Sequence, residues 1–376
     1  MKAFQLKGLA AMFAVGMMAI TGAASAQTVN GAGATLPQPL YEDLFGLDGT
    51  SKDVIGTWTY DGVGSGGGKS RFLTTTNTVN FAGSDSVLTA TEFATYNSSQ
   101  RASWGPLIQI PSVLTSVTLP FKMPANASQT TLNLTRDQVC RIFANQITTW
   151  GQILGNTNTT PFVVVYRTEA SGTTELLSNF LTSAACSGYN FQKSNLFTTV
   201  VANSGGVNSN WIAATGSEGV SNALQTAGRF GYLSPSFAFN PGSATAVATI
   251  GGALPTSVQL PASATPPTGT ARNNPLNWVP AYVLPTNTAV YPIYGTTNLL
   301  VGQCYTGGIT SDSVGGAVRD FLTKLNNGSY ASQIATHLFI SLPASWRTAI
   351  TDAFLTQSSS LGIGNTSVCN GVGRPL

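Results

Sequence analysis

The sequence predicts an α/β fold divided between two domains, and three observations lead to this prediction. The chain has 376 residues, which is long enough for two domains with a hydrophobic core in each. Apolar segments typical of strands alternate along the chain with segments of helical periodicity. Hydrophobic residues make up 42% of the chain and charged residues only 8%, so uncharged polar side chains must cover most of the surface.

The individual elements are expected from local patterns. Prolines early in a helix, glycines after a helix end and continuous β-branched runs in buried strands are the guiding signals. In order, we predict a helix capped by Thr35 over 35–45 with Pro37 early in it, strands at 53–60, 79–82 and 161–166, a helix around 176–181, and a helix around 314–325 that stops at Asn327-Gly328. Residues 240–275 are rich in Pro, Ala, Thr, Ser and Gly and are expected to be irregular surface structure.

The N-terminus predicts export. Residues 1–26 have the features of a signal peptide, with Lys2 and Lys7 before an apolar run and Ala24-Ser25-Ala26 at the cleavage site. Removing these two lysines lowers the net charge from +3 to +1, so no surface for nucleic acid is expected. No other stretch is apolar enough to insert into a membrane. We therefore expect a periplasmic or secreted protein.

The four cysteines predict two disulfides, because an exported chain with an even number of cysteines folds under oxidising conditions. Three pairings are possible, and we favour Cys140–Cys186 with Cys304–Cys369 because both bridges are then local. A metal site is not expected, since no two cysteines are close in sequence and His337 is the one histidine of the chain.

Four segments at expected strand-to-helix connections could hold an anion. Small residues let the backbone approach a ligand closely, and the free N–H groups at a helix start favour negative charge. The segments are GAGATLP at 31–37, DGVGSGGGKS at 61–70, Gly83-Ser84-Asp85, and RTEASGTTELL at 167–177. Each alone is compatible with an ordinary turn or cap. Together they supply hydroxyls, a carboxylate and an arginine beyond the ends of strands, where open α/β sheets bind ligands.

The last of these segments is the most informative. Arg167 directly follows a buried strand and can bind an oxyanion through two hydrogen bonds. Ser171 and Thr173 add hydroxyls, and Gly172 and Thr173 add N–H groups at the start of a helix. Glu169 is positioned in sequence to hold Arg167 in place, or simply to form a salt bridge with it.

Enzyme motifs of similar composition do not fit this chain. A Walker A loop requires a glycine six residues before its lysine, and Val63 occupies that place before Lys69. Gly62, Gly64 and Gly67 match a dinucleotide fingerprint, but this motif alone is weak and an exported chain meets little nucleotide. We predict instead a loop whose N–H groups and hydroxyl surround an anion. No cofactor is expected, and no G-x-S-x-G nucleophile motif is present.

The four segments together resemble a known family. The chain contains, in the family's order and spacing, GAGATLPQPLY, DGVGSGGGKSRFL, VNFAGSDSVLT and VVVYRTEASGTTELLSNFL. It thereby resembles the phosphate-binding proteins of bacterial ABC transporters, and most of all their DING subgroup. The tetrapeptide that names the subgroup is half kept, since residues 28–31 read Thr-Val-Asn-Gly. The likeness extends over essentially all of the mature chain.

The resemblance implies a Venus-flytrap fold of the periplasmic binding protein type, with the ligand in a cleft between two α/β domains. Domain I would combine residues 27–110 with 289–376, and domain II would comprise 111–288. The implied function is high-affinity binding of inorganic phosphate, without catalysis, for uptake by an ABC permease complex or for scavenging outside the cell; a monomer is expected. The implied phosphate-binding residues are Thr35, Leu36, Ser65, Asp85, Arg167, Ser171, Gly172 and Thr173, with Glu169 supporting Arg167.

Asp85 is the predicted source of selectivity. A buried anion must be fully hydrogen-bonded. Phosphate carries a proton at neutral pH and sulfate does not, so a fixed carboxylate accepts a hydrogen bond from phosphate and repels sulfate. Arsenate resembles phosphate in shape and protonation and is expected to bind to some extent. The alternatives are a secreted phosphatase that uses the same site and a binding protein for another oxyanion, such as arsenate or sulfate.

Overall fold

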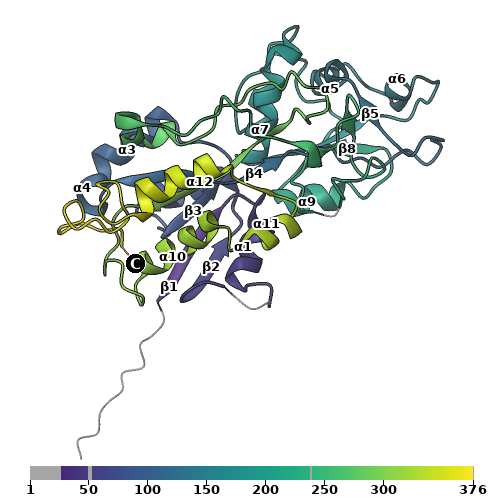
Figure 1. Cartoon of the computed structure of the whole chain (residues 1–376). Coiled ribbons are helices and arrows are strands. Elements are labelled where there is room, and N and C mark those ends of the chain that lie inside the picture. The colour runs from purple at the N-terminus through teal and green to yellow at the C-terminus, as the bar shows by residue number, and fades with distance from the viewer. Residues whose placement is uncertain (1–26, 50–52, 238, 376) are drawn as a thin grey trace, which may run out of the picture.

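The computed structural model describes residues 27–49, 53–237 and 239–375, and the predicted signal peptide lies outside them. Strands and helices alternate as predicted (Figure 1). The first half contains β1 (Thr28–Gly33), α1 (Gln38–Phe45), β2 (Thr57–Asp61), α2 (Gly64–Leu73), β3 (Phe81–Ser84), α3 (Ala90–Ser99), α4 (Arg101–Trp104), β4 (Leu107–Ser116), β5 (Asn133–Leu134), α5 (Arg136–Phe143), α6 (Trp150–Leu154), β6 (Val163–Arg167) and α7 (Gly172–Leu181). The second half contains α8 (Phe197–Val201), β7 (Ile212–Ala214), α9 (Gly216–Ala223), β8 (Arg229–Gly231), β9 (Thr249–Ile250), β10 (Tyr294–Gly302), α10 (Val314–Asn327), α11 (Ala331–Thr336), β11 (Ile340–Ser341) and α12 (Ala344–Ile350).

A six-stranded sheet forms the core of the first domain, in the order β11-β4-β10-β3-β1-β2. The strand β1 pairs in parallel with β2 and β3, whereas β10 runs antiparallel to β3 and β4. Parallel neighbours need crossover connections, and α1 and α2 provide them. The carboxyl ends of β1, β2 and β3 therefore lie at one edge of the sheet.

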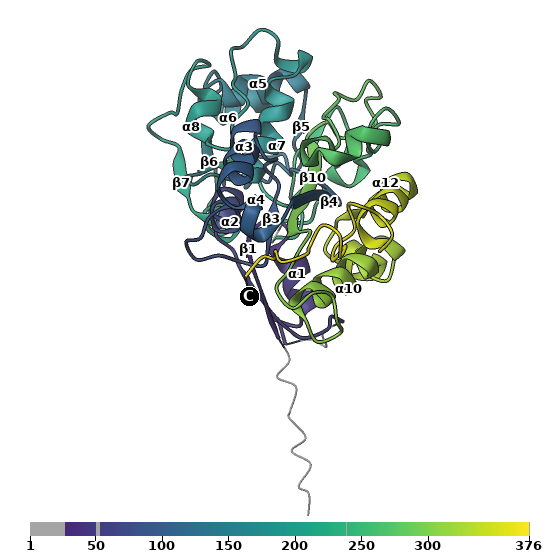
Figure 2. The ribbon, with the colours of Figure 1, turned by 90° about the vertical axis from the view of Figure 1, so that its left-hand side faces the viewer.

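Helices cover both faces of this sheet. On one face, α1 and α10 enclose an aromatic cluster in which the rings of Phe45 and Trp58 stack with their centroids 4.5 Å apart and Phe321 meets both rings. On the other face, the buried side chains of Phe72, Tyr96 and Trp104 belong to α2, α3 and α4 and pack in a separate cluster. The sheet is thus the middle layer of the domain (Figure 2).

A smaller parallel sheet, in the order β7-β6-β8, forms the second domain together with the pair β5-β9. The two-domain α/β fold predicted from the sequence is confirmed. Both favoured disulfides are also confirmed: Cys140–Cys186 fastens α5 in the second domain, and Cys304–Cys369 joins the end of β10 to the C-terminal segment. None of the described helices has the length and apolar run needed to cross a membrane.

The strands β4 and β10 lie side by side within the first-domain sheet and lead toward the second domain (Figure 2). Their antiparallel pairing continues past the end of β4, where the Val117 N–H donates to the Ile293 carbonyl at 2.9 Å. Thr118 then exchanges backbone hydrogen bonds with Leu233, next to β8 of the second domain. The same strand segment is therefore anchored in both domains.

Two local predictions were wrong. The glycine-rich stretch forms the helix α2 rather than a loop, because α2 packs directly on the backbone of β1: a Cβ at Gly68 would lie 2.5 Å from the Gly33 Cα. Such close packing requires glycine and outweighs its low helix propensity. Thr35 does not cap α1, since Pro37 occupies the cap position and the Thr35 hydroxyl bonds across the domain boundary instead.

Candidate functional site

The eight predicted anion ligands lie buried where the two domains face each other, and Glu169 beside them is partly buried. From the first domain, Thr35 and Leu36 follow β1, Ser65 lies in the first turn of α2, and Asp85 follows β3. From the second domain, Arg167 ends β6, while Ser171, Gly172 and Thr173 form the start of α7. The site is thus built from strand ends and helix starts on both sides.

The start of α7 lies directly against two residues of the first domain. A Cβ at Gly172 would lie 2.4 Å from the Ser65 Oγ and 2.4 Å from the Asp85 Cβ. The backbone N–H of Asp85 donates to the Ser65 Oγ at 3.1 Å. Glycine at position 172 therefore permits the helix start, with its free N–H groups, to approach the Asp85 carboxylate.

Arg167 extends from the second domain to Thr35 in the first. Its Nη2 donates to the Thr35 Oγ1 at 3.1 Å, and its Nε donates to the Glu169 Oε1 at 2.7 Å. Burial alone would raise the pKa of the Glu169 carboxyl, but the hydrogen bonds and charge of Arg167 hold that pKa below its ordinary value. The ionised Glu169 thus orients the guanidinium toward the site.

Two polar atoms of the predicted ligands are buried without a hydrogen-bond partner among the described residues, the Asp85 Oδ1 and the Thr173 Oγ1, and the Thr297 Oγ1 near Asp85 is a third such atom. Leaving such atoms unpaired is costly, so buried polar groups almost always have partners. A small protonated oxyanion would supply a donor for the carboxylate and acceptors for the hydroxyl and the guanidinium. The arrangement can therefore bind such an anion through hydrogen bonds.

The Asp85 carboxyl is strongly perturbed. Burial raises its pKa to about 7, against the opposing effects of the nearby Thr297 hydroxyl and the Arg167 charge, and the charge of Glu175 adds to the rise. The carboxylate is thus poised to exchange a proton or a hydrogen bond near neutral pH.

We expect domain closure of the ligand-free protein to depend on pH. In an open form Asp85 is hydrated and its pKa is about 4; in the closed form it is about 7. Between these values the closed form binds the extra proton, so closure is favoured at acid pH and this advantage is lost as the pH rises through about 7.

Small-angle scattering should give a larger radius of gyration at pH 8 than at pH 5. The variant Asp85→Asn should lose the difference; a pH-independent radius in the unmodified protein would contradict the assignment.

Sequence reasoning missed a contribution from the start of α9. The Ser217 N–H donates to the Thr35 Oγ1 at 3.2 Å, and the two hydroxyls lie 2.9 Å apart. The Gly216 N–H donates to the Glu169 Oε1 at 3.1 Å. Thr215-Gly216-Ser217 follows β7 and opens a helix, so this segment has the same strand-to-helix signal as the four that were recognised.

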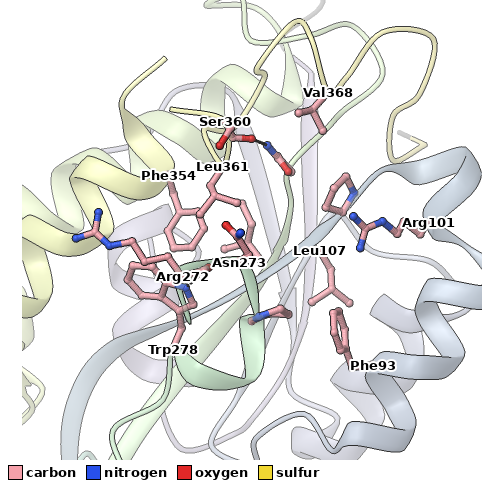
Figure 3. A pocket seen from close by; sticks show the side chains of 14 residues that line it. Phe93, Arg101, Leu107, Arg272, Asn273, Trp278, Phe354, Ser360, Leu361 and Val368 are labelled. Atoms are coloured by element: carbon pink, nitrogen blue, oxygen red, sulfur yellow. Dashed lines mark hydrogen bonds between the residues drawn. The ribbon is translucent and has the colours of Figure 1, made fainter. Parts of the chain in front are cut away.

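A separate cavity of about 280 Å³ lies between β4 of the first-domain sheet and the segment 272–278, beside Trp278 and Phe354 and with Arg101 and Arg272 on opposite sides (Figure 3). Its lining includes none of the predicted anion-site residues. The chemistry described above therefore belongs to the interdomain site and not to this cavity.

Comparison with known proteins places this geometry in a family. Residues 19–323 match the model of the PBP superfamily domain. The chain is 43% identical to alkaline phosphatase L of Pseudomonas aeruginosa, with 94% of this chain and 95% of that protein covered. It is 41% identical to a phosphate-binding protein from an unknown prokaryotic organism, with 92% of this chain and 100% of that protein covered.

Among solved structures, the chain matches a high-affinity periplasmic phosphate-binding protein, PfluDING, whose structure was determined with bound phosphate. The TM-score is 0.80 at 39% sequence identity, and the match covers 93% of this chain and 100% of that one. The similarity thus extends over both domains rather than one of them.

Proposed function

Since the chain belongs to the PBP superfamily and groups with its DING phosphate-binding members, we propose that it captures inorganic phosphate between its two domains and releases it unchanged. The observation that carries this proposal is the pair of buried, unpartnered polar atoms, the Asp85 Oδ1 and the Thr173 Oγ1, beside the Arg167 guanidinium. A protonated phosphate fits this combination of one acceptor, one hydroxyl and one cation.

We further propose domain boundaries and a set of phosphate ligands. Domain I comprises residues 27–110 with 289–376, and domain II comprises 111–288. The phosphate ligands are Thr35, Leu36, Ser65, Asp85, Arg167, Ser171, Gly172 and Thr173, supported by Glu169. In this proposal the protein works as an exported, periplasmic monomer that delivers phosphate to an ABC permease or scavenges it outside the cell.

The name of the Pseudomonas relative raises phosphoester hydrolysis as a second candidate. A serine nucleophile needs a base to activate it. The Ser65 Oγ accepts the Asp85 N–H, and the Ser171 Oγ accepts the Thr174 N–H at 3.4 Å, so both hydroxyls serve structural hydrogen bonds. His337, whose Nε2 lies 3.0 Å from the Asp43 Oδ2, follows α11 in the first domain. This arrangement favours binding over catalysis.

Isothermal titration tests the proposal, using protein freed of bound ligand by unfolding and refolding with its disulfides intact. We expect saturable one-to-one binding of phosphate and little heat from sulfate. No phosphate binding by a folded sample would refute the proposal. Turnover of p-nitrophenyl phosphate that disappears in Ser171→Ala would instead establish the phosphatase.

The variant Asp85→Asn is expected to narrow the preference for phosphate over sulfate. Its amide still occupies the site but no longer repels sulfate, and it accepts the phosphate proton less strongly. Phosphate affinity should fall by about tenfold, from the loss of roughly 1.5 kcal/mol of charge-assisted hydrogen bonding. Competition titrations with sulfate measure the effect, and an unchanged selectivity ratio would remove Asp85 from the role of discriminator.

A further inference from the structure

A second group of buried polar residues joins the two domains beside the anion site. The Ser86 Oγ donates a short hydrogen bond to the Glu175 Oε2. The Lys69 Nζ lies 3.3 Å from the same hydroxyl, and the Asn195 Nδ2 lies 3.4 Å from it. Lys69 lies on α2 and Ser86 follows the end of β3, whereas Glu175 lies on α7 and Asn195 precedes α8. One hydroxyl is therefore shared between residues of both domains.

The members of this group are buried as deeply as the anion ligands. Ser86 is 1% exposed, Lys69 3% and Glu175 8%. The Lys69 ammonium also bonds within its own domain, to the Val87 carbonyl at 3.1 Å and to Glu92 at 3.0 Å. The partner of the Glu175 carboxylate, in contrast, is the Ser86 hydroxyl of the opposite domain.

We propose that the Ser86–Glu175 hydrogen bond is an interdomain latch that stabilises the closed, phosphate-bearing form and slows phosphate release. This inference rests on the proposed function. Glu175 acts here as a positioning residue, because its carboxylate accepts the Ser86 hydroxyl and has no hydrogen bond to a predicted anion ligand among the described residues.

The hydrogen bond favours closure because Glu175 and Ser86 are solvated in the open form and buried in the closed form. When the domains separate, water can solvate the Glu175 carboxylate and the Ser86 hydroxyl, so neither group is left unpaired. In the closed form Glu175 is buried, and a buried carboxylate without a donor strongly disfavours that form. The hydrogen bond therefore contributes to closure rather than to the folding of either domain.

The latch also borders the anion site electrostatically. Glu175 and Asp85 line the same cavity of about 190 Å³, together with Lys193. The charged groups that face Glu175 are thus Asp85 and Lys193 across this cavity and Lys69 through Ser86. When the latch opens, the negatively charged Glu175 carboxylate moves away from Asp85. Phosphate release and the protonation of Asp85 are therefore linked.

The test is phosphate release measured by stopped flow in Ser86→Ala. We expect release about tenfold faster than in the unmodified protein, because a charge-assisted hydrogen bond is lost in the closed form alone. The association rate and the melting temperature of the ligand-free protein should stay close to their original values. Glu175→Gln, which keeps an acceptor but loses the charge, should give a smaller increase in the release rate.

The matched control is Ser178→Ala. Ser178 is equally buried and lies on the same helix as Glu175, but its hydroxyl donates to the Glu175 carbonyl at 2.7 Å within the second domain. This variant should lower the melting temperature and leave release unchanged. An unchanged release rate in Ser86→Ala, or equal losses of ligand-free stability in both variants, would overturn the latch.

Failure of the latch is distinguishable from failure of the proposed function. If the unmodified protein binds no phosphate, the proposed function fails, and the latch is judged on ligand-free protein by small-angle scattering. Ser86→Ala should then be more open than the unmodified protein and than Ser178→Ala. Equal radii of gyration in the three proteins would refute the latch independently of any ligand.

Discussion

Replacing Arg167 with methionine is expected to weaken phosphate binding by about a hundredfold or more, since breaking a buried charge pair costs roughly 3–5 kcal/mol. The Arg167 side chain is 2% exposed. Its guanidinium lies between the Thr35 hydroxyl and the Glu169 carboxylate. Without it, the anion would meet the Asp85 and Glu169 carboxylates with the Arg167 charge no longer offsetting them. Attraction would become repulsion, and titration calorimetry should register the change directly.

Two further variants separate charge from geometry at this position. Arg167→Lys keeps the charge but loses the planar fork, so affinity should fall to an intermediate value. Glu169→Gln leaves the guanidinium in place with a weaker partner, and a smaller loss is expected. The Arg167 N–H donates to the Tyr232 hydroxyl through the backbone, so the strand end should keep its position in all three variants. Affinity within about threefold of the original in Arg167→Met would contradict this role, because such a change is less than 1 kcal/mol.

Several elements could be predicted because each of them has a strong local signal. The β-branched run before Arg167 forms β6, and the apolar residues at helical spacing before Asn327-Gly328 form α10, which ends at the left-handed Gly328. Burial of such continuous patterns favours one structure whatever the surroundings. The alternation of these elements was sufficient to predict α/β layers.

Features that depend on tertiary packing could not be predicted in the same way. The run of three glycines at 66–68 within α2 has weak helix propensity, and its helical structure depends on contact with the β1 backbone at Gly33. Thr35 satisfies every local criterion for a helix cap, yet its hydroxyl lies 2.9 Å from that of Ser217, a residue 182 positions away. The competing partner is distant in sequence and leaves no local sign.

The residues of the candidate site also include some that could be predicted from the sequence and some that could not. Residues predicted from strand ends and helix starts are brought together in one place by the topology, because parallel strands end at the same edge of a sheet. The latch residues Ser86 and Glu175 also lie after a strand end and in the first turn of a helix, but they are 89 positions apart and neither segment indicates that they pair. Only the closed arrangement of the domains makes them partners.

Adding one methyl group at Gly172 is expected to prevent closure of the domains and to weaken phosphate binding by about a hundredfold or more, because overpacking and lost ligand contacts each cost roughly 1–3 kcal/mol. The new Cβ would lie 2.4 Å from the Ser65 Oγ and 2.7 Å from the Asp85 Oδ2. Neither neighbour moves easily, since the Ser65 hydroxyl is fixed by the Asp85 N–H at 3.1 Å. Alanine is a good helix former, so the same change should not destabilise α7 in the open protein.

The variant Gly172→Ala therefore predicts an unusual combination of results: a ligand-free melting temperature at or above the original value, with severe loss of affinity. Gly188→Ala is the matched control, because a Cβ at Gly188 has no heavy atom within 4 Å. That variant should bind phosphate normally. Scattering should show that Gly172→Ala remains open at saturating phosphate, since the steric barrier acts on closure itself. If Gly172→Ala closes and binds phosphate as the Gly188 control does, then the start of α7 does not approach Ser65 and Asp85 in the working protein, and the proposed site would have to be rebuilt without it.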